Sequence, residues 1–379
     1  MIILGLPSFH HSGWGLVKDG KIIRAVQEER LNRIKHYPYG SDLIKNPMVL
    51  GIEYLYRGLD FSLKDTDALT IPVLPKEKKY HNFQHIEVNS IDEALNQNLR
   101  PDYKTLLSYI KSEGFSGKVV YVNHQLSHAA YAYNYSGFKK CDIISYDGAG
   151  CGWPPEVVVG YHVSNHSYQR LFTHTVPHSL GHVYSNTTKT IFGKNSDGKE
   201  GKTMGLAPYG KSRDKFRMLT LDQERDMFVS TYQSTTKVPY RGISPWSEVF
   251  GLRQSNIKPR EERKPWNLNS KDDLFYADLA ASAQHAVELA GSHYIKKMKK
   301  ITGSKNLCIT GGVALNSCMN GKVRRQNIYE NTFAPPACHD GGHGLGAPLY
   351  YSNYVKPNTE FKKVNTDFLG YPYSDKECL

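Results

Sequence analysis

Several features are missing from this sequence, and each absence excludes a class of protein. No window approaches 18 uninterrupted apolar residues, which excludes a transmembrane helix. The opening stretch MIILGLPSFHHSG has neither a basic start nor a long apolar core, so we expect a buried strand there and not a signal peptide. The six cysteines show no CxxC spacing, which is typical of reduced thiols and predicts a cytoplasmic protein. No GxxxxGK[ST] motif occurs, which disfavours a P-loop kinase or ATPase.

The composition indicates a folded, basic protein. Hydrophobic residues make up 39% of the 379 residues, which is enough for a sizeable core. At roughly 150 residues per domain, the length predicts two to three domains. The 48 Lys and Arg against 36 Asp and Glu leave a net charge of +12. This charge predicts anionic partners, namely phosphates, nucleotides or nucleic acid, without choosing among them.

The order of predicted strands indicates a duplication. Each half opens with three strands and continues with helices that alternate with single strands. The strands are expected at residues 2–6, 15–17, 22–26, 68–72 and 119–122, and again at 143–146, 156–162, 170–176 and 307–310. The turn Asp19-Gly20 is a strong hairpin signal. The pattern predicts an α/β fold of two ribonuclease-H-like halves facing a central cleft, as in the actin, sugar-kinase and Hsp70 superfamily. One mixed α/β domain with coincidental hairpins is the alternative.

The predicted boundaries follow from this pattern. We expect the first half at residues 1–138, the second at 139–355 and a tail at 356–379. Residues 211–270 interrupt the second half with 12 basic and 7 acidic residues and four prolines. They predict an insertion that covers the cleft or carries a surface loop. A single long helix is expected to follow at 272–300.

Two histidines and two aspartates are candidate metal ligands. His124 and His128 are four residues apart, so they share one face of a helix that follows the predicted strand 119–122. The spacing of these two histidines alone fits a structural pair without a metal equally well. Asp147, in YDGAG, and Asp340, in CHDGGHGLG, are expected at equivalent strand ends. Two histidines and two aspartates together suit iron, manganese or zinc.

Glycine-rich segments are candidate phosphate sites. The glycines beside both aspartates allow the backbone to approach a phosphate closely. Gly201 and Gly205 flank Lys202, which resembles a phosphate-binding loop. The pair Gly311-Gly312 follows a predicted strand, where backbone N–H groups would face an anion or a nucleotide.

A histidine in the first loop is a candidate base. His10 lies between the first two predicted strands, where it would face the cleft and could deprotonate a hydroxyl. A loop histidine without a role fits the spacing equally well.

Taken together, these motifs resemble those of the O-carbamoyltransferase family, over almost the whole chain from Ile3 to about residue 375. The resemblance is carried by FHHSGWGLVKDGKI at 9–22, EERLNRIKH at 28–36, NHQLSHAAYAY at 123–133, YDGAG at 146–150, HSLGHVYS at 178–185, EGKTMGLAPYG at 200–210, ITGGVALN at 309–316 and PPACHDGGHGLGA at 335–347.

The resemblance implies a function and a set of site residues. The family moves a carbamoyl group from carbamoyl adenylate to an alcohol, in a domain related to the tRNA threonylcarbamoyl transferases. The implied ligands of a divalent metal, expected to be iron(II), are His124, His128, Asp147 and Asp340. The implied adenylate residues are Gly148, Gly150, Lys202, Gly311, Gly312 and Asn316, with Glu200 in support.

The catalytic assignment is less direct. His10 takes the place of the family's general base, with Lys35 as a supporting catalytic residue. The family's usual pattern has His-Asp followed by small residues, whereas here His10 is followed by His11 and then by the bulky Trp14. His11 therefore stays an alternative base.

The resemblance also implies partners. A YrdC-like domain makes carbamoyl adenylate from carbamoyl phosphate and ATP in full-length family members, and FLGYPYSD at 368–375 resembles the linker into it. We therefore expect a YrdC-like domain or protein to act in cis or in trans. The charge and the basic insertion favour a phosphorylated acceptor, such as a hydroxymethylated pyrimidine nucleotide or a DNA base, over a neutral sugar. The alternatives are a subunit of a tRNA threonylcarbamoyl transferase and a non-enzymatic nucleotide-binding regulator.

Overall fold

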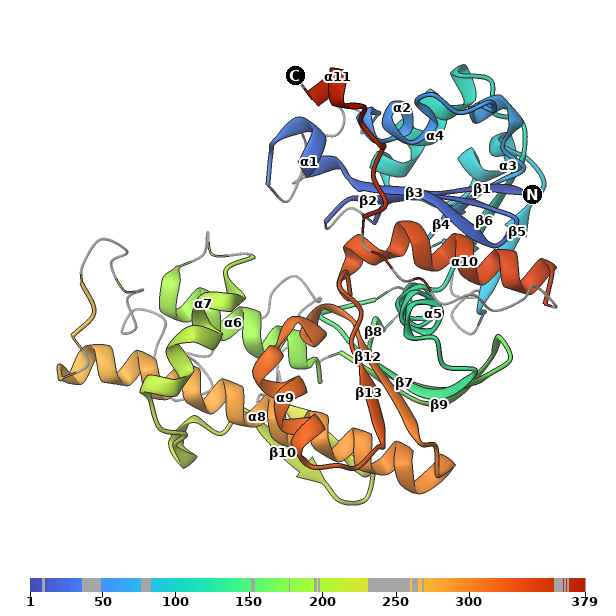
Figure 1. Ribbon diagram of the computed structural model, residues 1–379. Coiled ribbons are helices and arrows are strands. Elements are labelled where there is room, and N and C mark those ends of the chain that lie inside the picture. The colour runs from blue at the N-terminus through green and yellow to red at the C-terminus, as the bar shows by residue number, and fades with distance from the viewer. Residues whose placement is uncertain are drawn as a thin grey trace.

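Two mixed β-sheets with the same strand order form the framework of the protein (Figure 1). The computed structural model describes residues 1–8, 11–35, 49–75, 83–150, 154–176, 178–193, 196, 198–230, 260, 265–267, 269–357, 364, 366 and 368–378. The first sheet, in the order β3-β2-β1-β4-β6-β5, consists of β1 (Ile2–Gly5), β2 (Gly13–Lys18), β3 (Lys21–Gln27), β4 (Ala68–Ile71), β5 (His85–Val88) and β6 (Lys118–Val122). The second, in the order β9-β8-β7-β12-β13, consists of β7 (Lys140–Tyr146), β8 (Glu156–Ser164), β9 (Ser167–Thr175), β12 (Asn306–Thr310) and β13 (Asn331–Phe333).

The two sheets repeat one pairing pattern. The first strand of each, β1 or β7, pairs antiparallel with the next strand and parallel with the fourth, β4 or β12. The fourth pairs parallel with β6 or β13. The hairpin between β2 and β3 turns at Asp19 and Gly20, whose φ angles of 49° and 76° are the positive values that a type I′ turn requires. The predicted duplication of ribonuclease-H-like halves is confirmed.

Two equivalent helices, α5 (His124–Ser136) and α10 (His343–Val355), lie side by side between the sheets (Figure 1). Helix α5 follows β6 and packs on β7 and β12, whereas α10 follows β13 and packs on β1 and β2. The close approach of α10 depends on glycine, because a Cβ atom at Gly5 or Gly15 would overlap the carbonyl group of Gly344. Residues of both sheets and both helices share one apolar core, which joins the halves.

The other helices lie outside the two sheets, where some contact strands directly and others pack on neighbouring helices. They are α1 (Glu28–Asn32), α2 (Leu50–Tyr56), α3 (Ile91–Leu95), α4 (Pro101–Ser112), α6 (Leu180–Phe192), α7 (Glu200–Leu206), α8 (Lys271–Thr302), α9 (Ser317–Arg325) and α11 (Asp375–Cys378), with 3₁₀ turns η2 (Leu63–Asp65), η4 (Ala207–Tyr209), η5 (Asp214–Phe216), η7 (Gly312–Leu315) and η8 (Asp340–Gly342). Helix α8 begins after Ser270, whose hydroxyl oxygen accepts a hydrogen bond from the Asp273 N–H, and ends at Gly303 with a φ of 64°. The predicted helix at 272–300 is confirmed to within two residues. No helix in the described ranges is long and apolar enough to cross a membrane.

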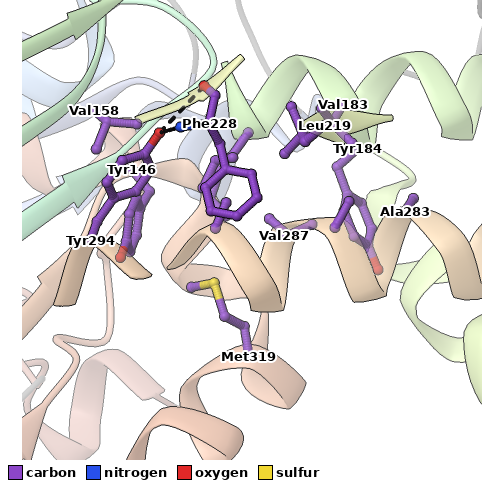
Figure 2. Close-up of a cluster of buried hydrophobic side chains, with 14 of the residues drawn as sticks. Tyr146, Val158, Val183, Tyr184, Leu219, Phe228, Ala283, Val287, Tyr294 and Met319 are labelled. Atoms are coloured by element: carbon purple, nitrogen blue, oxygen red, sulfur yellow. Dashed lines mark hydrogen bonds between the residues drawn. The ribbon is translucent and has the colours of Figure 1, made fainter. Parts of the chain in front are cut away.

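The apolar core of the second half fixes the strand that leads into the site. Figure 2 shows Tyr146, the last residue of β7, beside Tyr294 of α8. The Tyr146 hydroxyl donates a hydrogen bond of 2.7 Å to the carbonyl oxygen of Gly291. The Phe228 N–H donates one of 2.9 Å to the Tyr294 hydroxyl, drawn as a dashed line in Figure 2. These buried contacts hold the end of β7, and hence the residue that follows it, in place.

The predicted insertion contains structure that the sequence did not indicate. Strands β10 (Leu219–Asp222) and β11 (Met227–Ser230) form a small antiparallel sheet inside residues 211–270. Most of the remaining insertion, at 231–259, 261–264 and 268, lies outside the described residues. The predicted boundaries of the halves, the insertion and the tail stay predictions. In the described part of the tail, the carbonyl oxygen of Leu369 accepts a hydrogen bond of 2.9 Å from the Ala25 N–H of β3.

Candidate functional site: a buried His–Asp cluster between the two halves

The cluster forms where the two equivalent helices begin. Asn123 caps α5, because its side-chain oxygen accepts a hydrogen bond of 3.1 Å from the Leu126 N–H, so the helix starts at His124. His128 lies one turn later. Asp340 opens η8, and His343 is the first residue of α10. Donor atoms of His124, His128, Asp340 and His343 all lie within 4.8 Å of one another.

Asp147 joins this cluster from the end of β7. Its Oδ2 atom lies 2.8 Å from Nε2 of His124 and 3.7 Å from Nε2 of His128. The Asp340 Oδ1 atom lies 3.7 Å from Nε2 of His124 and 3.4 Å from Nε2 of His128. The structure therefore brings together all four residues that the resemblance names as metal ligands.

Neighbouring side chains hold the two carboxylates in place. Gln125 donates a hydrogen bond of 3.4 Å to Oδ2 of Asp147, and its own side-chain oxygen accepts one of 2.5 Å from the Ser145 hydroxyl. The Gly148 N–H donates one of 2.7 Å to Oδ1 of Asp147. In the first half, the Ser8 hydroxyl donates one of 2.6 Å to Oδ2 of Asp340. Asp340 is thus held by a residue from the far end of the chain.

The electrostatics of the cluster favour charged carboxylates. Burial raises the pKa of Asp147 and of Asp340, but the neighbouring histidines outweigh this effect and hold both values well below the usual range. Burial lowers the pKa of His128, but Asp147 and Asp340 outweigh it and raise that pKa to about 9. A divalent cation entering the cluster would displace the proton of His128, because metal binding and proton binding compete for the same lone pair.

His343 is the member of the cluster that the sequence analysis missed. Its side chain is fully buried, and its ring centroid lies 4.3 Å from that of His124 and 4.0 Å from that of His128. Burial and the two neighbouring histidines lower its pKa well below the usual value, so the ring is neutral. The available signal was the spacing Asp340-x-x-His343, which places both side chains on one face of a helical turn.

The two predicted catalytic residues are not part of the described cluster. His10 lies outside the described residues. The next residue, His11, has a φ of 65°, and its ring lies 4.7 Å from the ring of His339, which directly precedes Asp340. Lys35 is exposed, and within the described ranges it makes no hydrogen bond or ion pair with the cluster. Ser8 and His11, on either side of His10 in the sequence, therefore contact residues of the 339–340 segment, whereas Lys35 makes no described contact with the cluster.

The glycines predicted to hold the adenylate lie around Asp147. A Cβ atom at Gly312 would lie 3.3 Å from Oδ1 of Asp147. Gly311 has a φ of 86°, and a Cβ atom there would overlap the carbonyl group of Tyr146. Gly150 donates its N–H to the carbonyl oxygen of Glu156 at 2.7 Å. Gly311 therefore requires glycine, and Gly311 and Gly312 bring the segment after β12 close to the end of β7.

The remaining predicted adenylate residues lie farther along the second half. Glu200 is the first residue of α7 and is partly buried. Lys202 lies in the first turn of α7. It lines a pocket of about 340 Å³ together with Phe192, Gly205, Leu206, Arg260 and Trp266. Asn316 exchanges two hydrogen bonds with Gln284, at 2.9 and 3.1 Å, and its oxygen also caps α9. Much of the hydrogen-bonding capacity of the Asn316 amide is therefore used within the protein.

The fold and the cluster together define the class of protein. Two ribonuclease-H-like halves with the same strand order give this chain the fold of the actin, sugar-kinase and Hsp70 superfamily, with a candidate metal site between the halves. A solved structure described as full-length HypF in the phosphate- and nucleotide-bound form superimposes with a TM-score of 0.50 at 14% identity, covering 94% of this chain and 46% of that chain. At this identity the likeness shows the fold alone.

Sequence comparison identifies the family. Residues 2–349 match the family described as the carbamoyltransferase N-terminus. Nodulation protein NolNO of Sinorhizobium fredii is 33% identical over 379 residues, covering 97% of this chain and 50% of that protein. An uncharacterized Synechocystis protein is 30% identical over 404 residues, covering 99% of this chain and 61% of that protein. The chain belongs to the carbamoyltransferase family and spans one half to about three fifths of the length of these relatives.

Proposed function

We propose that this chain transfers a carbamoyl group from carbamoyl adenylate to a hydroxyl group of an acceptor. The observation that carries the proposal is the buried His–Asp cluster, found in a chain of which residues 2–349 match the carbamoyltransferase N-terminus. The cluster draws its residues from both halves and is bordered by glycine-rich loops. Such a site can hold a metal ion beside a phosphate group.

The proposed reaction needs a base and a site for a good leaving group. The acceptor oxygen attacks the carbamoyl carbon, the bond from that carbon to the phosphate oxygen breaks, and AMP leaves with the bonding electrons. The proton of the acceptor hydroxyl passes to a base. His10 is the proposed base, with His11 as the alternative. The position of this loop supports both, because Ser8 contacts Asp340 and His11 contacts His339.

The residues of the cluster fit a divalent metal. Imidazole and carboxylate donors suit iron, manganese or zinc, and iron(II) is the ion we propose. Both ring nitrogens of His343 and Nδ1 of His128 are buried without a hydrogen-bond partner among the described residues. Unpartnered buried polar atoms are rare in proteins, and a bound cation would satisfy some of them. When bound, the metal would supply positive charge near the carbamoyl oxygen and the departing phosphate.

The loops beside the cluster are proposed to hold the adenylate. The backbone at Gly148 and Gly312 borders Asp147 and would lie next to the phosphate. Gly150 and Gly311 keep these loops close together, and Glu200 and Lys202 of α7 would contact the nucleoside. Asn316 is also proposed to contact the adenylate, and its position is fixed because its oxygen caps α9.

The net charge indicates the class of acceptor, and the family indicates the source of the carbamoyl adenylate. The net charge of +12 favours a phosphorylated acceptor, either a hydroxymethylated pyrimidine nucleotide or a hydroxymethylated base in DNA. Carbamoyl adenylate is proposed to come from a YrdC-like domain or protein, in cis or in trans, acting on carbamoyl phosphate and ATP.

An acceptor comparison tests the proposal. The chain is incubated with synthetic carbamoyl adenylate and either hydroxymethyl-cytidine monophosphate or an aminoglycoside, and products are analysed by mass spectrometry. We expect the nucleotide to gain one carbamoyl group. Preferential carbamoylation of the aminoglycoside would contradict the charge argument. Turnover from carbamoyl phosphate and ATP alone would contradict the need for a YrdC-like partner.

A further inference from the structure

His343 and His124 occupy equivalent positions in the duplicated fold. The two sheets share an order of five strands, and the last of these is β6 in the first sheet and β13 in the second. The helix that follows this strand, α5 or α10, lies between the sheets. His124 is the first residue of α5, and His343 is the first residue of α10. Their ring centroids are 4.3 Å apart. The duplication therefore places one histidine from each half at the point where the two helices start together.

The described side chains around His343 do not form hydrogen bonds with its two ring nitrogens. The side chain is fully buried, and neither ring nitrogen has a hydrogen-bond partner within the part of the chain that the structure describes. A structural histidine in a protein interior normally donates or accepts at least one hydrogen bond. The groups around His343 include two imidazole rings and a carboxylate, which are metal ligands rather than apolar packing partners.

The donor atoms are almost close enough to share one ion. One donor atom each of His124, His128, Asp340 and His343 lies within 4.8 Å of the other three. A cation with bonds of about 2.1 Å needs its donors within about 4.2 Å of one another. The donor atoms therefore need to approach one another by only about 0.6 Å at the widest pair to share one ion.

We propose that His343 is a ligand of the metal ion, so that the site offers three imidazole donors where the sequence motifs indicated two. The inference rests on the metal site of the proposed function. His124, His128 and His343 supply neutral nitrogen donors, and Asp340 supplies charge. Asp147, whose Oδ2 atom lies 2.8 Å from Nε2 of His124, completes the set of candidate donors.

X-ray absorption spectroscopy of the chain loaded with Co²⁺ tests the proposal without a variant. We expect multiple scattering from three imidazole rings. In His343→Gln we expect two rings, and a Co²⁺ dissociation constant, from competition with a chelator, that is raised by about tenfold to a hundredfold or more. A spectrum with two rings in the unmodified chain, together with unchanged Co²⁺ affinity in His343→Gln, would overturn the inference.

Two further variants separate the possible failures. His174→Gln is the matched control, because His174 is also buried with an unpartnered Nε2 atom but packs between Phe172 and Tyr294 in another core. It should bind Co²⁺ like the unmodified chain. His128→Ala tests the site itself: if it also binds Co²⁺ normally, the metal site of the proposed function is wrong, whatever the role of His343. If His343→Gln does not fold, the number of imidazole rings around Co²⁺ in the unmodified chain still tests whether His343 is a ligand.

Discussion

The hydroxyl of Ser8 donates a hydrogen bond of 2.6 Å to Oδ2 of Asp340, across 332 positions of the chain. Ser8 follows the first strand of the first half, and Asp340 follows the last strand of the second. The bond therefore ties the loop of the proposed base to a proposed metal ligand. Because of this hydrogen bond, the interface between the two halves is part of the site.

The first prediction concerns the base. His10→Ala should slow carbamoyl transfer by about 10²- to 10⁴-fold, the usual contribution of a general base, and leave AMP affinity unchanged. Single-turnover transfer from carbamoyl adenylate and calorimetric titration with AMP measure the two quantities. His11→Ala serves as the comparison and should reduce transfer much less. If His11→Ala abolishes transfer and His10→Ala does not, His11 is the base.

The second prediction concerns the link across the halves. Ser8→Ala removes a hydrogen bond to an ionised carboxylate, so we expect the free energy of unfolding to fall by about 1.5 to 3 kcal/mol. Co²⁺ affinity should fall by about tenfold, because Asp340 loses the bond that orients it. Ser112→Ala is the control, since the Ser112 hydroxyl is exposed and bonds within its own helix, to the Tyr109 carbonyl. Equal Co²⁺ affinity in Ser8→Ala and Ser112→Ala would show that the link does not orient Asp340.

The third prediction separates two glycines. Gly311→Ala should destabilise the protein severely, because the residue has a φ of 86° and a Cβ atom would overlap the Tyr146 carbonyl group. Gly201→Ala should raise the free energy of unfolding by up to about 1 kcal/mol, because Gly201 lies within α7 and a Cβ atom there meets no atom within 4 Å. Urea unfolding of both variants measures the effects. Similar stability of the two would contradict the described backbone at Gly311.

The fourth prediction concerns pH. Burial, with repulsion from Lys297, lowers the pKa of His174 from 6.5 to about 4, so the folded state keeps this ring neutral. Between these two values the unfolded chain binds more protons than the folded one. The contribution of His174 to stability is therefore complete above about pH 6.5 and is lost as the pH falls towards 4.

At pH 5 this loss amounts to about 2 kcal/mol relative to neutral pH. Urea unfolding at pH 7.5 and pH 5 should show a smaller difference for His174→Gln than for the unmodified chain. An identical difference for both proteins would show that His174 is protonated in the folded state.

Most of the framework could be predicted because its signals are local. The turn Asp19-Gly20 marks the hairpin β2–β3, and the long helix α8 has a serine cap and a glycine stop. The short strands β5 and β13 and the hairpin β10–β11 were missed. Short strands such as these are defined by the partners with which they pair, which lie elsewhere in the chain.

The site was predictable where its spacing is local. His124 and His128 are neighbours on one helix face, and Asp147 follows a clear buried strand. His343 was missed because its proximity to His124 spans 219 positions and arises only when α5 and α10 pack together. The same holds for Ser8, whose partner is defined by the joint between the halves.

The most direct test of the proposed carbamoyl transfer is the release of AMP from carbamoyl adenylate by the purified chain. AMP release is measured with and without hydroxymethyl-cytidine monophosphate. Both measurements are repeated after a chelator has removed the metal. We predict rapid AMP release that requires the acceptor and yields one carbamoylated product per AMP. This release should be lost with the metal and restored by Fe²⁺. Release that is independent of acceptor and metal, with no carbamoylated product, would contradict the proposed carbamoyl transfer.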